Sequence, residues 1–101
     1  MSITTDLSAD GRSMTINVNG RFDFSTHQDF RAAYEQGPGP EARYVLDLGQ
    51  TEYMDSSALG MLLMLREHAG GPSANVRIAN CAEPIRNVLT IANFQQLFSI
   101  D

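Results

Sequence analysis

Two adjacent serines, Ser56 and Ser57, directly follow an aspartate in the middle of the chain. A serine hydroxyl can accept a phosphoryl group, and beside a base it can act as a nucleophile. Asp55 is well placed to cap a helix N-terminus, because Met54 and Leu59 flank it at the spacing of a hydrophobic staple. Both serines then lie in the first turn of that helix. They could be sites of modification, or they could be ordinary residues of a helix start.

A helical wheel of residues 56–70 separates two faces. One face gathers the residues that should bury against a sheet: Ala58, Met61, Leu62, Leu65 and Ala69. The opposite face carries Ser56, Gly60, Leu63, Met64 and Glu67. A helix that needed only solubility would show more charge there, so the apolar side chains indicate a docking surface for a partner. Gly60 would permit close approach, and Leu63 and Met64 would offer adaptable apolar contact.

Phosphorylation at the edge of that surface would change its charge. A phosphate on Ser56 adds about −1.5 to −2 charges, which the helix N-terminus would itself favour by about 0.3 to 1 kcal/mol. A docked partner would instead desolvate the dianion or bring it against the carboxylates of Asp55 and Glu52. A loss of about 3 kcal/mol weakens a complex more than a hundredfold. Modification is therefore expected to release a partner without unfolding the domain, while Ser57 has a structural role near the cap.

The same serine could instead be a catalytic nucleophile, with His27 as base and Asp23 or Asp55 as the group that orients it. No Gly-x-Ser-x-Gly elbow surrounds Ser56, and so short a chain has little room for a substrate pocket and an oxyanion scaffold. We therefore expect no enzymatic activity. His27 and His68 are expected in surface or capping roles, although His27 follows the turn at Asp23 and could approach Ser56.

The composition argues against several other classes of function. The net charge is −5 and no window clusters arginine, so nucleic acid is not an expected partner. Every basic residue is arginine, and the lack of lysine excludes Schiff-base chemistry and a P-loop. Cys81, the single cysteine, cannot form an internal disulfide, and with two distant histidines it cannot supply a zinc site. We expect no metal and no cofactor.

Length and hydropathy set the expected location and organisation. The 101 residues suit one domain, residues 1–101, with one core. The first ten residues mix Asp6 and Asp10 into a short apolar alternation, which is unlike a signal peptide. No run approaches the length of a membrane span, so a cytoplasmic protein without a membrane partner is expected.

The first half of the chain predicts a hairpin and a helix. Residues 14–20 alternate apolar and polar side chains, as in a strand with one buried face, and residues 3–7 form a weaker strand. Asp10 and Gly11 between them predict a tight turn. Ser25 and Gln28 have the spacing of a capping box, so a helix is expected over about residues 26–35.

The second half predicts alternating strands and helices. Residues 44–48 are nearly all apolar, as expected of a central strand covered on both faces by helices, with Asp47 in a hydrogen-bonded structural role. A helix over 56–69, a strand over 75–79, a helix opening at Pro84 and a short apolar turn or helix over 94–98 follow. This order implies an α/β fold with a mixed sheet and an antiparallel edge made by the opening hairpin.

These motifs together resemble a known family. The run Tyr44-Val45-Leu46-Asp47-Leu48, followed by Met54-Asp55-Ser56-Ser57-Ala58-Leu59-Gly60, is similar to the signature of STAS-domain anti-sigma factor antagonists, the SpoIIAA-like family. Gly20-Arg21-Phe22-Asp23 also resembles the family's Gly-x-Leu-Asp element, and the element order agrees over essentially the whole chain. The resemblance implies a STAS-like fold, with a mixed four- to five-stranded sheet, an antiparallel N-terminal edge and about four covering helices.

The resemblance also implies a partner switch. An unphosphorylated antagonist binds an anti-sigma factor, a serine protein kinase phosphorylates it and causes release, and a serine phosphatase resets it. The phosphate acceptor is then Ser56, with Asp23 beside it. Ala58 stands where the family has glycine, and Phe22 replaces an aliphatic residue. The alternative is a STAS-like scaffold subunit of a signalling or lipid-transport assembly, in which Ser56 is not phosphorylated.

Overall fold

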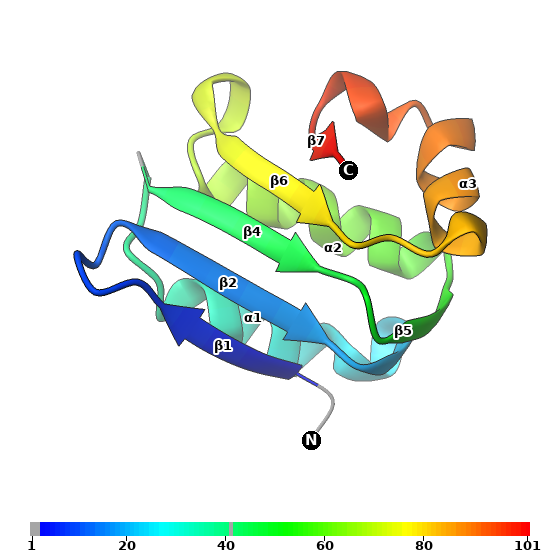
Figure 1. Ribbon diagram of the computed structural model, residues 1–101, viewed down its shortest axis with the longest axis horizontal. Helices are drawn as coiled ribbons and strands as arrows, with labels where there is room; N and C mark the ends of the chain where they lie inside the picture. The colour runs from blue at the N-terminus through cyan, green and yellow to red at the C-terminus, as the bar shows by residue number, and fades with distance from the viewer. Residues whose placement is uncertain (1–2, 41) are drawn as a thin grey trace.

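The computed structural model describes residues 3–40 and 42–101, which form a mixed sheet with helices against one of its faces (Figure 1). The five-stranded sheet of these residues has the order β1-β2-β4-β6-β7. Its strands are β1 (Ile3–Leu7), β2 (Ser13–Val18), β4 (Arg43–Asp47), β6 (Asn75–Ala79) and β7 (Ser99–Ile100). β1 pairs with β2 antiparallel, and the other neighbouring strands pair parallel. The predicted mixed sheet with an antiparallel N-terminal edge is confirmed.

The turn between β1 and β2 has the chemistry that its sequence predicts. One carboxylate oxygen of Asp10 accepts hydrogen bonds from the Arg12 backbone N–H, at 3.0 Å, and from the Ser8 hydroxyl, at 2.6 Å. Gly11 has a φ of +73°, a conformation that glycine adopts at little cost. The hairpin therefore closes on local hydrogen bonds, and residue pairs such as Ile3 and Val18 come into register.

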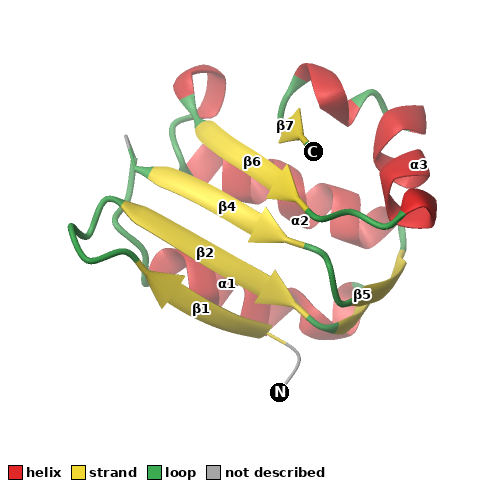
Figure 2. Ribbon diagram, viewed as in Figure 1, coloured by secondary structure: helices red, strands yellow, loops and turns green. Residues whose placement is uncertain are grey.

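In the described residues, three α-helices accompany the sheet (Figure 2). They are α1 (His27–Glu35), α2 (Ser56–His68) and α3 (Glu83–Ile91), joined by the short 3-10 turns η1 (Phe24–Thr26), η2 (Gly71–Ser73) and η3 (Phe94–Gln96). Pro84 lies in the first turn of α3, as expected, and Asn93 ends that region with a φ of +61°. The predicted apolar turn near the C-terminus is η3, in which Phe94 is buried.

The core lies between the sheet and the two helices behind it. Alternate strand residues are buried there: Met14, Ile16 and Val18 on β2, Tyr44 and Leu46 on β4, and Val76 and Ile78 on β6. The helix residues that cover them include Phe30, Tyr34, Ala58, Met61, Leu62 and Leu65. The buried face that the wheel predicts for α2 is confirmed, with Ala69 buried just after the helix.

One expectation about the central strand is wrong, because β4 is covered by helices on one face only. α1 and α2 lie behind the sheet in Figure 1, and the face toward the viewer carries no described helix. Val45 and Asp47 point to that open face and are half-buried. The neighbouring strand β2 offers Thr15 and Asn17 at the paired positions, so the second face has too little apolar surface to hold a helix layer.

Asp47 has the structural role expected of it. Its carboxylate accepts hydrogen bonds from the Gly49 backbone N–H, at 2.9 Å, and from the side-chain amide of Asn80, at 3.1 Å. Asn80 follows β6 and has a φ of +61°. These bonds tie the carboxyl ends of β4 and β6 together before the chain turns toward β5 and α3.

A second, two-stranded sheet extends the carboxyl end of the first, and the sequence patterns did not predict it. β3 (Gly20–Phe22) pairs parallel with β5 (Thr51–Met54). The Thr51 hydroxyl donates a buried hydrogen bond of 2.7 Å to the Val18 carbonyl, and the Gly20 N–H donates to the Gln50 carbonyl at 2.9 Å. β5 therefore lies across the ends of β2 and β4 in Figure 1, at the start of α2.

His68 and Cys81, two residues whose side chains could do chemistry, are both half-buried in the fold. His68, expected in a surface or capping role, is half-buried in the last turn of α2, with its ring centroid 4.9 Å from that of Tyr34 and 6.2 Å from that of Tyr44. Burial raises the pKa of the Cys81 thiol.

Within residues 3–40 and 42–101, no three His, Cys, Asp or Glu side chains are grouped as metal ligands. Nor has any helix of those residues the length and apolarity needed to cross a membrane.

The bond from Thr51 to Val18 predicts a measurable contribution to stability. Thr51→Val keeps the shape of the side chain but leaves the buried Val18 carbonyl without this donor, so the free energy of unfolding should fall by about 1 to 2 kcal/mol. Urea unfolding followed by circular dichroism measures the change. The control Thr4→Val, at an exposed position of β1, should stay within about 0.5 kcal/mol of the parent chain. Equal stability of the two variants would contradict the role assigned to Thr51.

Candidate functional site

The site begins where β3 and β5 end side by side. In their parallel register, Arg21 lies opposite Tyr53 and Phe22 lies opposite Met54. Phe22 and Met54 are buried, which anchors the ends of both strands in the core. The next residue on each strand is an aspartate, so Asp23 and Asp55 leave the small sheet at neighbouring positions. The predicted proximity of Asp23 to the serine segment thus follows from strand pairing.

Asp55 caps α2 as the sequence predicts. Its backbone is extended, with φ −117° and ψ −175°, and one carboxylate oxygen accepts a 3.1 Å hydrogen bond from the Ala58 N–H. The same oxygen accepts a 2.6 Å hydrogen bond from the Ser57 hydroxyl. Ser57 is half-buried and its hydroxyl is already used in this cap, which agrees with its expected structural role.

Asp23 makes an equivalent arrangement at η1. One of its carboxylate oxygens accepts hydrogen bonds from the backbone N–H of Ser25, at 3.0 Å, and from the Ser25 hydroxyl. The other oxygen accepts a 3.1 Å bond from Nε of Arg21, whose guanidinium also lies 4.1 Å from the centroid of the Tyr53 ring. The expected capping box at Ser25 is therefore wrong, since Asp23 is the capping residue and Ser25 donates to it.

The two turns share one pattern of residues, Asp-x-Ser, in Asp23-Phe24-Ser25 and Asp55-Ser56-Ser57. The middle residue of each turn points outward. Ser56 is exposed, and its hydroxyl makes no hydrogen bond to the described part of the chain. Phe24 is 72% exposed. The sequence reasoning overlooked Phe24, although the repeated pattern beside a second capping aspartate was a signal that could have pointed to it.

The surface predicted along α2 lies on the exposed side of that helix. We call it the docking surface and define it by Ser56, Gly60, Leu63, Met64 and Glu67. Gly60 and Glu67 are exposed, and Leu63 and Met64 are 40% and 55% exposed. A Cβ atom at Gly60 would meet nothing within 4 Å, so packing inside the molecule does not require glycine there.

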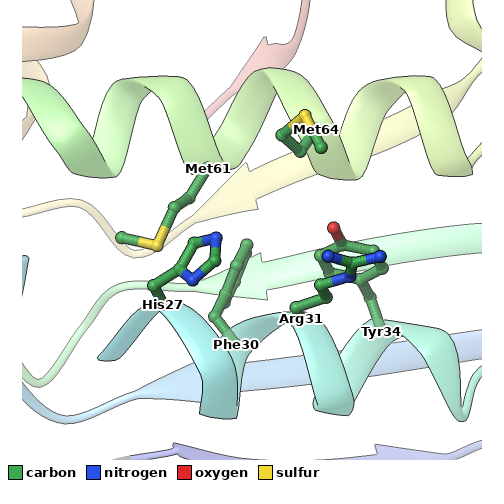
Figure 3. A pocket seen from close by; sticks show the side chains of 6 residues that line it. All are labelled: His27, Phe30, Arg31, Tyr34, Met61 and Met64. Atoms are coloured by element: carbon green, nitrogen blue, oxygen red, sulfur yellow. The ribbon is translucent and has the colours of Figure 1, made fainter. Parts of the chain in front are cut away.

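A narrow crevice between α1 and α2 adjoins the docking surface (Figure 3). Its lining residues are His27, Phe30, Arg31, Tyr34, Met61 and Met64. Its volume of about 10 Å³ gives room for about one water molecule, far less than the several hundred Å³ of a substrate pocket. Met61 reaches from α2 toward the ring of His27 in Figure 3.

The arrangement does not support a catalytic serine. His27 stacks on the ring of Phe24, with centroids 5.5 Å apart and an interplanar angle of 15°. Among the described residues, no hydrogen bond links His27 to Ser56, to Asp23 or to Asp55. Asp23 and Asp55 are each engaged in capping a turn or helix. The side chains that a nucleophile mechanism would need are thus near one another in the fold without forming a relay.

Comparison with known proteins relates most of the chain to one domain type. The family model described as "Mlab, STAS domain" matches residues 5–99. A STAS-domain containing protein of Pseudomonas aeruginosa (strain UCBPP-PA14) is 56% identical over 100 residues, which cover 99% of this chain and 99% of that protein.

Solved structures give the same relation. The crystal structure of an antisigma-factor antagonist STAS domain from Rhodobacter sphaeroides is 31% identical, with a TM-score of 0.60, and the match covers 77% of this chain and 84% of that one. The structure of the anti-sigma factor antagonist SpoIIAA in its unphosphorylated form is 18% identical, with a TM-score of 0.71 and a coverage of 98% and 86%. The second likeness shows the shared fold.

The cap at Asp55 predicts a difference between two substitutions. Asp55→Ala removes the acceptor for the Ala58 N–H, so the free energy of unfolding should fall by about 1 kcal/mol. Asp55→Asn keeps a side-chain oxygen at the same position and should lose much less. Urea unfolding of the three chains measures both effects. Equal losses in the two variants would mean that the carboxylate charge, rather than the cap, stabilises α2.

The surroundings of Asp23 predict an acidic titration. The Ser25 hydroxyl, and after it the Arg21 guanidinium, hold the pKa of the Asp23 carboxyl below its ordinary value. Because the pKa is lower in the folded state, the stabilisation is present above the ordinary aspartate pKa and is lost as the pH falls through the lowered value. In an NMR titration of the carboxyl carbon, Ser25→Ala should raise this pKa, and Arg21→Ala should raise it less.

Ser57→Ala is the matched control for that titration. It removes the corresponding hydroxyl from Asp55 and leaves the Asp23 turn intact, so the midpoint of Asp23 should not move. An Asp23 pKa at the ordinary value in the parent chain would contradict the arrangement described for η1.

Proposed function

The chain belongs to the STAS-domain family, and on that premise we propose that it is an anti-sigma factor antagonist that works by phosphorylation-gated partner switching. Unphosphorylated, it binds an anti-sigma factor through the docking surface and so regulates transcription indirectly. When Ser56 is phosphorylated, it releases that partner. The observation that carries the proposal is the exposed hydroxyl of Ser56 at the N-terminus of α2, which makes no hydrogen bond to the described residues and lies on the same face as Leu63 and Met64.

The geometry favours Ser56 over its neighbour as the phosphate acceptor. The Ser57 hydroxyl is half-buried and donates to Asp55, so its phosphorylation would break the cap of α2. Ser56 is free of such bonds within the described residues, and a phosphate there would lie at the positive end of the helix dipole. The folded domain can therefore carry the modification at little cost.

A bound partner would respond differently to the phosphate. The new dianion would enter a surface that contains Glu67 and lies beside Asp55, two carboxylates for which the described residues provide no ion pair. A partner surface that fits the uncharged hydroxyl would have to remove water from the phosphate, which costs free energy. Otherwise it would have to move away and lose its apolar contacts with Leu63 and Met64. The charge therefore acts on the complex rather than on the fold.

The proposal includes the proteins that would operate the switch. A serine protein kinase, which in this scheme is the anti-sigma factor itself or acts with it, phosphorylates Ser56, and a serine phosphatase removes the phosphate. We propose that the chain is one domain, without catalytic activity, a cofactor or a nucleic-acid partner, and that it works in the cytoplasm. The switch is supported by the likeness to the STAS domain of an antisigma-factor antagonist from Rhodobacter sphaeroides, to which this chain is 31% identical.

The decisive test uses the charge at position 56. Ser56→Asp should weaken binding to a purified anti-sigma factor from the source organism more than about a hundredfold, whereas Ser56→Ala should bind like the parent chain. Isothermal titration calorimetry measures the affinities, and thermal unfolding checks that both variants remain folded. With the kinase and ATP, mass spectrometry should locate the phosphate on Ser56 and find none in Ser56→Ala.

Ser73→Asp is the control for added charge, because Ser73 is exposed in η2, beyond the opposite end of α2. Its binding should match that of the parent chain. Unchanged binding by Ser56→Asp, or phosphate at another residue, would overturn the switch. A partner held equally by all variants would instead fit the scaffold subunit of a signalling or lipid-transport assembly.

A further inference from the structure

The register of β3 and β5 places the turn that carries Phe24 and the turn that carries Ser56 at the same end of the small sheet. Phe22 and Met54 are paired, and two positions beyond them lie Phe24 and Ser56, each directly after a capping aspartate. Neighbouring strands run about 4.8 Å apart, so the two turns start within contact range of each other. A charge added to Ser56 would therefore appear at the end of the small sheet that also carries the exposed Phe24.

Phe24 is held in its exposed position by several contacts. Asp23 closes the turn through Ser25, and the Thr26 hydroxyl donates a 2.7 Å hydrogen bond to the Asp23 carbonyl. The Phe24 ring stacks on His27, the first residue of α1. An aromatic ring fixed in this way loses little conformational freedom when a partner covers it, which is the property of a preorganised binding residue.

His27 connects Phe24 to the docking surface. Its ring stacks on Phe24 and also lines the crevice between α1 and α2 with Met61 and Met64. Phe24 therefore contacts a residue, His27, that lines the same crevice as Met64 of the docking surface. The apolar contact area around Ser56 thus has two sides, one on η1 and α1 and the other on α2.

The charges around this area indicate the chemistry of the partner. Two guanidinium groups that border it are already paired, Arg21 with Asp23 and Arg31 with Glu35. Asp55 and Glu67 have no cationic partner within the described residues, and the whole chain carries a net charge of −5. A complementary surface is therefore apolar in the middle and basic at its edge.

We propose that Phe24 is an anchor residue for the partner protein, which receives its ring in an apolar pocket rimmed by arginine or lysine. This inference rests on the proposed function and names the partner chemistry of the same site. A phosphate on Ser56 then acts at the mouth of that pocket, where it disturbs the seating of the ring. The fit of the Phe24 ring in that pocket would also help to determine which anti-sigma factor is bound.

Affinity measurements test the anchor directly. Phe24→Ala should weaken the complex with the anti-sigma factor by about 30-fold or more, as expected for a central aromatic residue of an interface. Ile91→Ala is the matched control, because Ile91 is 83% exposed at the end of α3, and its affinity should stay within about twofold. The affinity of the parent chain should also fall as salt is added. Equal effects of the two substitutions would overturn the proposal.

Site-specific photo-cross-linking separates this inference from the proposed function. The photo-reactive p-benzoylphenylalanine replaces Phe24 or, as control, Ile91 in the full chain, expressed in the source organism. The expected result is one adduct from position 24 that disappears in the Ser56→Asp background, with none from position 91. Mass spectrometry should place the cross-link in a partner segment with apolar residues next to arginine or lysine.

Each outcome decides one of the two ideas. An adduct with these properties to an anti-sigma factor supports both. The same adduct to a protein that is neither an anti-sigma factor nor a serine kinase supports the anchor and overturns the proposed function. No adduct at position 24, equal adducts at both positions, or an adduct to a second copy of this chain overturns the anchor, and the Ser56 variants still decide the switch.

Discussion

The parallel pairing of β3 with β5 is the constraint on which the functional end of the molecule depends. Burial of Phe22 and Met54 fixes the ends of both strands, and the hydrogen bond from Thr51 to Val18 ties β5 to the main sheet. Two capping turns then start side by side. Backbone register therefore places their outward residues, Phe24 and Ser56, at the same end of the small sheet.

α2 has one face that packs on the sheet and another that is exposed, and the helical periodicity assigns different residues to each. Ala58, Leu62 and Leu65 are fully buried and hold the helix on the sheet, whereas Ser56 and Met64 lie on the exposed side. Because the two sets do not share side chains, a charge can be added to the exposed face without a cavity or an unpaired group in the core. Stability and recognition can therefore change independently in this domain.

Much of the fold could be predicted from the residues, because strong patterns have local causes. The buried face of α2, the Asp55 cap and the Asp10-Gly11 turn depend on neighbours in sequence, and the structure confirms each of them, as the comparisons confirm the family. β3, β5 and β7 were missed, since strands of two to four residues carry almost no periodicity. Their existence depends on pairing partners far along the chain.

The candidate site was predicted only in part, for a similar reason. Ser56 and the exposed face of α2 follow from one continuous segment, and so they could be located. Asp23 was placed beside Ser56 only through the family resemblance, and Phe24 was not considered, because its exposure follows from the turn that Asp23 closes. The open face of the sheet was also unexpected, because Val45 makes that side of β4 look more apolar than its surroundings are.

Gly60 lowers the helical stability of the N-terminal part of α2. Glycine inside a helix costs about 1 kcal/mol relative to alanine, and here no neighbouring atom requires it. The cost falls one turn after Asp55, so it weakens the segment of α2 that carries Ser56. An enzyme that must draw a serine into an extended backbone to act on it would have to unwind only that first turn, while the remainder of the helix stays packed on the sheet.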